Sequence, residues 1–270
     1  MEYYERPEVV TTILEFARAG NGKAVRESAF FNKFTQRIQR YFSLEHAERG
    51  QPLVLDSEAD LIAALRAGAT AFYCSYWRYP QPRKPLQPMG LDLVWTIRAK
   101  SGGLEFAKEV TAAAVEALID KGLGEPWVKY SGELGFDLLI PLELVVSGGW
   151  SSELELLTRV QQALTRYLAT RMLENFEVRG TCSPLEVKRG GNVCTLAELR
   201  MRRGLLLAPM SLNPRTGLVS LPIDPHRIEE FSVLEASPAD ARAYKWRITP
   251  TQEPELPIET QAFQEVLAPY

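Results

Sequence analysis

Cysteine and histidine are scarce in this chain of 270 residues. Three cysteines, at positions 74, 182 and 194, are widely spaced and form no CxxC pair, and His46 and His226 are the only histidines. A disulfide framework needs a larger set of cysteines, and a zinc ribbon needs paired thiol or imidazole ligands. The sequence therefore excludes both, and we expect Cys74, Cys182 and Cys194 to be small buried hydrophobes.

Long apolar runs are also missing. No stretch approaches the roughly 20 apolar residues that cross a bilayer, and the N-terminus, MEYYERPEVV, lacks the basic and then apolar pattern of a secretion signal. We therefore expect a cytoplasmic location and no membrane partner. The content of 46% hydrophobic and 24% charged residues is typical of globular proteins, and the length fits one large α/β domain or two packed halves.

Acidic residues slightly outnumber basic ones, giving a net charge of -3, which argues against indiscriminate coating of nucleic acid. The charge is unevenly distributed, because residues 179–215 hold seven basic side chains against Glu186 and Glu198, and the chain then turns acidic. This basic segment predicts either a surface that faces phosphates or an ordinary solvated surface.

The hydrophobic periodicity predicts an α/β fold. A spacing of three to four residues between apolar side chains, with capping and stop residues, predicts helices at 7–19, 58–67, 104–121 and 152–175. Strands are expected at 69–77, 91–99, 127–132, 136–146, 205–207 and 218–223. Recurring prolines after position 250 predict an extended arm with a short helix at 261–267, so we expect a domain at 1–248 and an arm at 249–270.

The expected strand at 91–99 has one apolar face and one mixed face. Leu91, Leu93, Trp95 and Ile97 alternate with Asp92, Val94, Thr96 and Arg98. Side chains two residues apart on a strand share a face. A functional site would lie on the mixed face.

Three segments combine glycines with polar residues near expected strands. They are GLDLVWTIRAK from Gly90, WVKYSGELGFDLLIP from Trp127 and LLLAPMSLNPRTGLVSLPI from Leu205. Together, in this order, they resemble the small, catalytic-type subunit of archaeal and eukaryotic DNA primases, of the archaeo-eukaryotic primase superfamily. The resemblance covers about residues 3–223. It implies mixed sheets flanked by helices, with one half of the RRM-like type that carries the active site.

The resemblance also indicates that the catalytic positions are degenerate. The family pattern GxDLxxDxD places Thr96 and Arg98 where two aspartates belong, and counting back along the third segment places the third aspartate at Met201. The family uses two divalent cations held by carboxylates. Arg98 would repel such ions, and Asp92 lies about 13 Å upstream on the strand, at about 3.3 Å per residue. We therefore expect no catalytic residue, no metal and no cofactor, and a structural role for Asp92.

Other positions keep the family's polar residues. Lys129, Ser131 and Gly132 match a segment that approaches phosphate in the family, whereas Asp137 and Asn213 replace histidines. The glycines could equally serve the turn alone, and Arg98 could form an ion pair with Asp92 or Asp137 instead of binding phosphate. The expected nucleotide or phosphate contacts are Arg98, Lys129, Ser131, Gly132, Arg203, Asn213 and Arg215.

These departures predict a non-catalytic primase-like protein of DNA replication or repair, which binds nucleic acid or takes part in a complex. Its partner could be a primase large subunit or an active small subunit. One alternative is an active primase or primase-polymerase in which Asp137 and Glu198 hold Mg²⁺ or Mn²⁺. Another is a sensor of nucleotide or single-stranded DNA.

Overall fold

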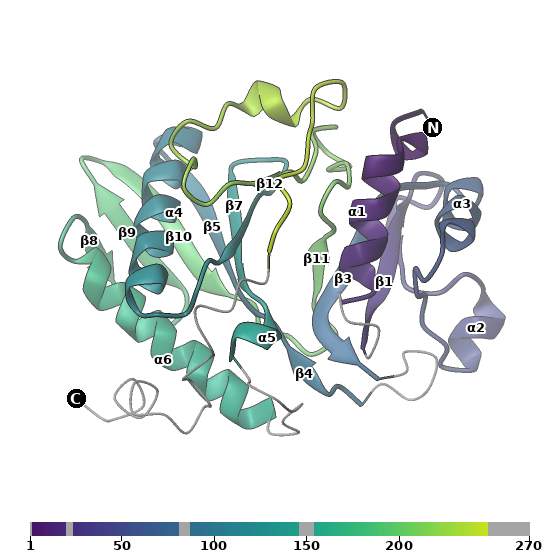
Figure 1. Cartoon of the computed structure of the whole chain (residues 1–270), viewed down its shortest axis with the longest axis horizontal. Helices are drawn as coiled ribbons and strands as arrows, with labels where there is room; N and C mark the ends of the chain where they lie inside the picture. Colours follow the sequence, from purple (N-terminus) through teal and green to yellow (C-terminus); the bar gives the residue numbers. More distant parts are fainter. Residues whose placement is uncertain (1, 20–23, 81–86, 146–153, 248–270) are drawn as a thin grey trace.

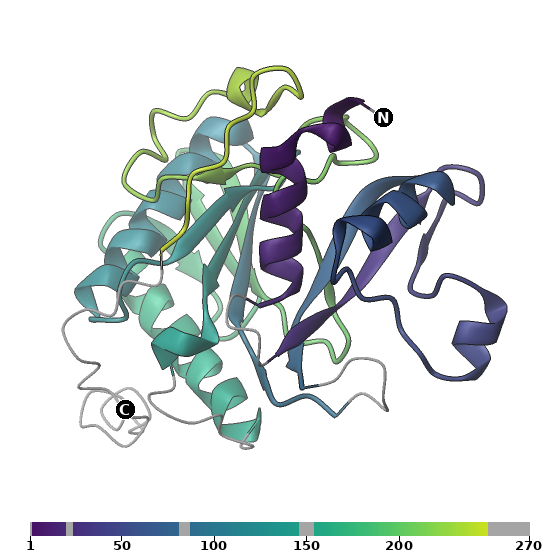
Figure 2. The ribbon, with the colours of Figure 1, turned by 45° about the vertical axis from the view of Figure 1, so that its right-hand side comes forward.

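The computed structural model describes residues 2–19, 24–80, 87–145 and 154–247, which form two antiparallel sheets with helices packed on them (Figure 1). Figure 2 shows the two sheets on opposite sides of the molecule, with the N-terminal helix between them. One continuous cluster of buried apolar side chains joins the helices to both sheets. Among the described residues, no helix is both long and apolar enough to cross a membrane.

The first sheet has the strand order β11-β3-β1-β2, and β4 pairs with β3. The helix α1 packs on β1 and β3, and α3 packs on β3. Pro7 at the start of α1 and the buried stripe of Val9, Ile13 and Phe16 explain this helix, and a capping box of Ser57 and Asp60 begins α3. The bounds in this half are η1 (Glu2–Glu5), α1 (Pro7–Ala17), β1 (Val25–Asn32), β2 (Arg37–Gln39), α2 (Leu44–Glu48), α3 (Glu58–Arg66), β3 (Ala69–Tyr79), β4 (Gly90–Leu91) and β11 (Leu205–Leu207).

The second sheet has the order β12-β6-β7-β5-β10-β9-β8. The helix α4 packs on β5, β7 and β10, and α6 packs on α4 (Figure 1). The bounds are β5 (Leu93–Ser101), α4 (Gly103–Asp120), β6 (Trp127–Tyr130), β7 (Gly135–Ile140), α5 (Leu142–Val145), α6 (Leu154–Met172), β8 (Glu177–Arg179), β9 (Leu185–Arg189), β10 (Asn192–Glu198), β12 (Pro222–Ile223) and η2 (Val233–Ala236).

The segment expected to be one strand at 91–99 is divided between the two sheets. β4 pairs with β3 of the first sheet, and β5 pairs with β7 and β10 of the second. Asp92 lies between β4 and β5, and its backbone N–H donates to the carbonyl of Tyr76 at 2.9 Å. The chain therefore passes from one sheet to the other at Asp92.

The C-terminal part of the described chain connects the halves. Lys108 of α4 donates to the carbonyl of Glu229, and Arg6, just before α1, donates to the carbonyls of Pro238 and Ala241. This segment crosses from α4 to α1 (Figure 1). It therefore supports the position of α1 between the two sheets.

Several sequence predictions need correction. The strand expected at 136–146 ends at Ile140, because Pro141 offers no N–H and the turn of α5 follows. The strand expected at 218–223 is paired as β12 only at its end. Cys182 is exposed, whereas Cys74 and Cys194 are buried as expected. The arm predicted at 249–270 lies outside the described residues.

Candidate functional site

The polar face of the second sheet collects side chains from three adjacent strands. Thr96 of β5 pairs with Asp137 of β7, and Asp137 pairs with Lys129 of β6. Residues paired across antiparallel strands point to the same face. Arg98, two residues after Thr96, lies on this face as well. The sheet thus brings together residues that are far apart in the sequence.

Lys129, Asp137 and Arg98 form a continuous network of charges. The buried Lys129 Nζ lies 2.5 Å from Asp137 Oδ2 and 2.8 Å from Ser220 Oγ. Arg98 donates to the other carboxylate oxygen of Asp137 and, through Nη1 at 2.5 Å, to the carbonyl of Phe136. Of the two ion pairs left open by the sequence, Arg98 forms the one with Asp137. We call Arg98, Lys129 and Asp137 the Asp137 network.

The Asp137 network carries two cations and one anion. Burial alone would raise the pKa of Asp137, but the charges of Arg98 and Lys129 hold this pKa below its ordinary value. Lys129 and Asp137 are almost fully buried, while the Arg98 side chain is 35% exposed. The excess positive charge is therefore accessible only through Arg98.

The residues on this face do not fit a pair of divalent cations. Thr195 and Ala197 of β10 lie opposite Arg98 and Thr96, so neither of these neighbouring positions supplies a carboxylate. Both oxygens of Asp137 face cationic partners. Within the described part of the chain, no three His, Cys, Asp or Glu side chains lie close enough to hold a metal ion. Magnesium and manganese require several oxygen ligands.

Met201 lies outside the paired strands that carry Thr96, Arg98 and Asp137. Met201 follows the end of β10 in a loop and its side chain is 77% exposed. Its carbonyl accepts hydrogen bonds from Tyr76 and Trp77. Met201 therefore does not lie in the strands that carry Thr96, Arg98 and Asp137, and its assignment as the third carboxylate position stays a prediction.

The fallback ligands Asp137 and Glu198 face opposite sides of the sheet. Asp137 and Ala197 both pair with Thr96, so their side chains share one face of the sheet. Glu198 is the residue after Ala197 along β10. Because successive side chains on a strand alternate, Glu198 points to the face of Trp95. The Glu198 carboxylate lies 2.7 Å from Arg200 Nε. These two acids therefore cannot share a metal ion.

A turn beside the network unites other predicted residues. Asn213 Nδ2 donates to the carbonyl of Ser131 at 3.4 Å, and Thr216 Oγ1 donates to the carbonyl of Gly132 at 2.6 Å. Gly132 has a φ of +78°, and a Cβ atom there would lie 2.8 Å from the Asn213 side chain. Glycine thus serves both the backbone conformation and the close approach. Ser131 is buried, and its hydroxyl has no hydrogen-bond partner within the described structure.

The two remaining phosphate candidates lie apart. Arg215 is largely exposed and pairs with Glu133 in the turn that precedes β7. Arg203 instead pairs with the buried Glu27 of β1, on the first sheet. Arg215 therefore belongs to the neighbourhood of the Asp137 network, and Arg203 does not.

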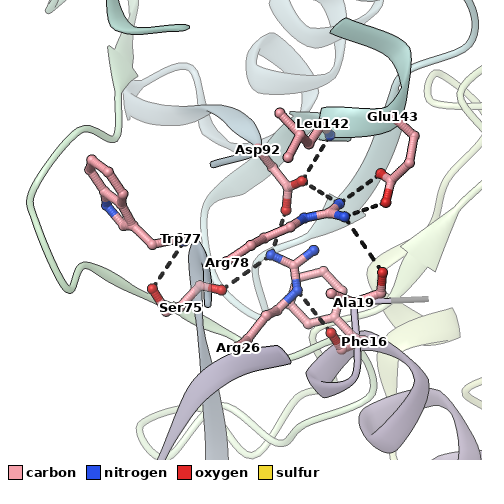
Figure 3. Close-up of polar contacts among 9 residues, drawn as sticks. All are labelled: Phe16, Ala19, Arg26, Ser75, Trp77, Arg78, Asp92, Leu142 and Glu143. Atoms are coloured by element: carbon pink, nitrogen blue, oxygen red, sulfur yellow. Dashed lines mark hydrogen bonds and ion pairs between the residues drawn. The ribbon is translucent and has the colours of Figure 1, made fainter. Parts of the chain in front are cut away.

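Asp92 is the centre of a second buried charge cluster (Figure 3). Arg26 Nη1 and Arg78 Nη2 each lie 2.5 Å from one of its carboxylate oxygens, and Arg78 also pairs with Glu143. Leu142 N–H donates to Asp92 at 3.0 Å. Burial raises the pKa of Asp92, but the two arginines more than reverse this and lower it. The structural role expected for Asp92 agrees with these contacts.

We call Asp92, Arg26, Arg78 and Glu143 the Asp92 cluster. Its two arginines also donate hydrogen bonds to carbonyls at the C-terminal end of α1. Arg26 Nε donates to the carbonyl of Phe16 at 2.8 Å, and Arg78 Nη1 donates to the carbonyl of Ala19 at 3.5 Å (Figure 3). Carbonyls at the end of a helix lack partners within the helix and carry partial negative charge. Arg26 and Arg78 were not predicted, because no strand was expected at 25–32 and the strand expected at 69–77 ended before Arg78.

Taken together, the two antiparallel sheets and their helices define a mixed α/β fold, as the sequence predicted. A structure with a similar fold is the polymerase domain of Mycobacterium tuberculosis ligase D in complex with DNA. The TM-score is 0.56 with 18% sequence identity, and the match covers 85% of this chain and 81% of the other. No family model matches the sequence, and neither does any curated protein.

Proposed function

We propose that this chain is a primase-like protein without nucleotidyl-transfer activity, which acts in DNA replication or repair by binding nucleic acid or by taking part in a complex. The fold is similar to a polymerase domain that binds DNA. In the proposed role, the primase small-subunit framework is kept as a scaffold, and a primase large subunit or an active small subunit is its protein partner.

The Asp137 network is the observation that carries this proposal. A two-metal site concentrates negative charge so that two cations can align the attacking oxygen and the triphosphate. On the corresponding face, Lys129 and Arg98 instead surround a single carboxylate. The charge of this face therefore has the wrong sign for divalent cations, and the proposed function includes no metal and no cofactor.

Primer synthesis tests the loss of activity. The purified chain is incubated with a single-stranded DNA template, ribo- or deoxyribonucleotides, and Mg²⁺ or Mn²⁺. We expect no oligonucleotide product on a denaturing gel. An active primase-polymerase run in parallel is the positive control. Product that disappears in Asp137→Asn would overturn the proposal and favour the active alternative.

A second candidate function is binding of nucleotide or single-stranded DNA. It is favoured by the unpaired hydroxyl of the buried Ser131 beside the cationic network. Charge-assisted hydrogen bonds from Arg98 and Arg215 to phosphate would supply affinity. This binding would need no chemistry, so it is compatible with the loss of the carboxylates.

Single-strand affinity is expected to depend on Arg215. Arg215→Ala should weaken the binding of a labelled oligo-dT about threefold to tenfold and reduce the salt dependence of binding, because one phosphate contact is lost. Arg227→Ala is the matched control, since Arg227 is similarly exposed and also pairs with one glutamate. Equal effects of both substitutions, measured by fluorescence anisotropy, would argue against a site at Arg215.

A further inference from the structure

The β1–β2 hairpin exposes several large apolar side chains at the edge of the first sheet. Phe34 is 73% exposed, and Ile38 and Phe42 are exposed as well. The exposed Met201 lies in the loop at 200–203, which contacts this hairpin through Arg203. We call residues 33–42 and 200–203 the hairpin surface. Large apolar side chains that are exposed to this extent are candidates for a binding surface.

The hairpin surface is also strongly basic. Residues 33–42 contain Lys33, Arg37 and Arg40 but no acid, and the loop adds Arg200, Arg202 and Arg203. Glu198 forms an ion pair with Arg200, and the buried Glu27 forms ion pairs with both Arg40 and Arg203. Six cations against two acids leave an excess of positive charge. An acidic ligand with apolar side chains would fit this combination.

Two of these arginines are held in fixed positions. Arg40 Nη1 lies 3.0 Å from Glu27 Oε1, and Arg40 Nη2 donates to the carbonyl of Arg203 at 2.7 Å. Arg203 has a φ of +58°, and its guanidinium donates hydrogen bonds to Glu27 and to the hydroxyl of Tyr41. Side chains that are already fixed lose little entropy when they bind a ligand. The guanidinium groups of Arg40 and Arg203 are therefore fixed in place, and Glu27 compensates part of their charge.

The hairpin surface lies beside a sheet edge. β2 is the terminal strand of the first sheet, and in the described part of the chain no other strand pairs with its outer edge. An exposed strand edge offers backbone groups to an extended peptide. A nucleic-acid strand cannot continue a backbone ladder, so the strand edge distinguishes a peptide from nucleic acid, which the exposed rings of Phe34 and Phe42 do not. These features favour a peptide.

The composition of the last 23 residues complements this surface. Residues 248–270 contain Glu253, Glu255, Glu259 and Glu265 but no lysine or arginine, together with apolar residues such as Phe263. At about 3.3 Å per residue this segment can span up to about 75 Å, whereas a domain of this size has a radius of gyration of about 18 Å. It can therefore reach the hairpin surface from its attachment at Arg247. A second hairpin surface would instead repel the first.

We propose that the acidic residues 248–270 bind the hairpin surface of the same chain. A more acidic partner would have to displace them, so the contact limits access to this surface. The inference does not depend on the proposed function, because it involves neither the Asp137 network nor nucleotides.

Site-specific photo-cross-linking of the full chain tests this contact. Benzoylphenylalanine introduced in place of Phe34 is expected to cross-link to residues 248–270, as identified by mass spectrometry. The matched control replaces Leu234, which is 75% exposed but lies in η2. The control position is expected to give no such cross-link. Mixing isotope-labelled and unlabelled chains distinguishes cross-links within one chain from those between chains.

Charge reversal then tests the pairing. Arg37→Glu should lower the cross-link yield from position 34 about threefold or more, as should raising the salt to about 0.5 M. Glu259→Lys with Glu265→Lys should restore the yield in the Arg37→Glu background. Cross-links to other residues, only between chains, or equally from position 234 would overturn the proposal. If position 34 cross-linked to oligo-dT and not to residues 248–270, the hairpin surface would be assigned to nucleic acid instead.

Discussion

Asp92→Asn is expected to lower the free energy of unfolding by about 3–5 kcal/mol, because removing one member of a buried ion pair leaves its partners uncompensated. Arg26 and Arg78 are both buried and both face this carboxylate (Figure 3). Urea denaturation followed by circular dichroism measures the change. The loss should appear as a lower midpoint with an unchanged slope.

Asp120→Asn provides the control for Asp92. Asp120 also pairs with an arginine, but its side chain is 50% exposed. An exposed pair contributes about 0–1 kcal/mol. If both substitutions cost the same small amount, the Asp92 cluster does not stabilise the fold in the way the contacts suggest.

The cost of Asp92→Asn should also depend on pH. The pKa of Asp92 is lowered in the folded chain, so its stabilisation is present above the unfolded value of about 3.9 and is lost as the pH falls through the folded value. The difference between the two proteins should therefore be constant near neutrality and shrink in acid. A difference that grew on acidification would contradict this sign.

Asp137→Asn has the second largest expected effect, a loss of about 3 kcal/mol or more in unfolding free energy. Lys129 is completely buried and would lose the negative charge of its ion-pair partner, keeping only neutral acceptors such as Ser220, while Arg98 can turn toward solvent. Thermal and urea unfolding would both report the loss. The same substitution is not expected to change primer synthesis, since none is expected from the parent chain.

A double replacement separates charge from packing in the Asp137 network. Lys129→Met with Asp137→Leu removes both buried charges and keeps apolar volume, which is often neutral or stabilising. The double variant should therefore be more stable than Asp137→Asn alone. Equal destabilisation by the two variants would indicate that shape, and not the unpaired lysine, determines the cost.

The four longer helices of the described chain, α1, α3, α4 and α6, could be predicted from the sequence because their apolar spacing and caps are local. The stripe of α1, the capping box of α3 and the long pattern of α4 each depend on neighbours within one or two turns. The β1–β2 hairpin and β8 were not predicted. β2 and β8 are short terminal strands with exposed residues, so their sequences carry little alternation.

The candidate site was predictable in part. The residues of the Asp137 network were identified, and the pair of Arg98 with Asp137 was one of two alternatives. Which residue lies opposite Thr96 depends on strand register, which places Ala197 there, and the sequence did not indicate this pairing. A shift of one residue exchanges the two faces of a strand. Because side chains alternate in this way, Asp137 and Glu198 lie on opposite faces of the sheet.

The passage of the chain between the sheets at Asp92 has a consequence for local opening. β4 and β5 are adjacent in sequence but are hydrogen-bonded to different sheets, and Asp92 holds an arginine from β1 and another from β3. Fraying of either half therefore weakens contacts in the other. Slow amide exchange is expected to extend through both sheets as one cooperative unit, with protection lost by the two halves together.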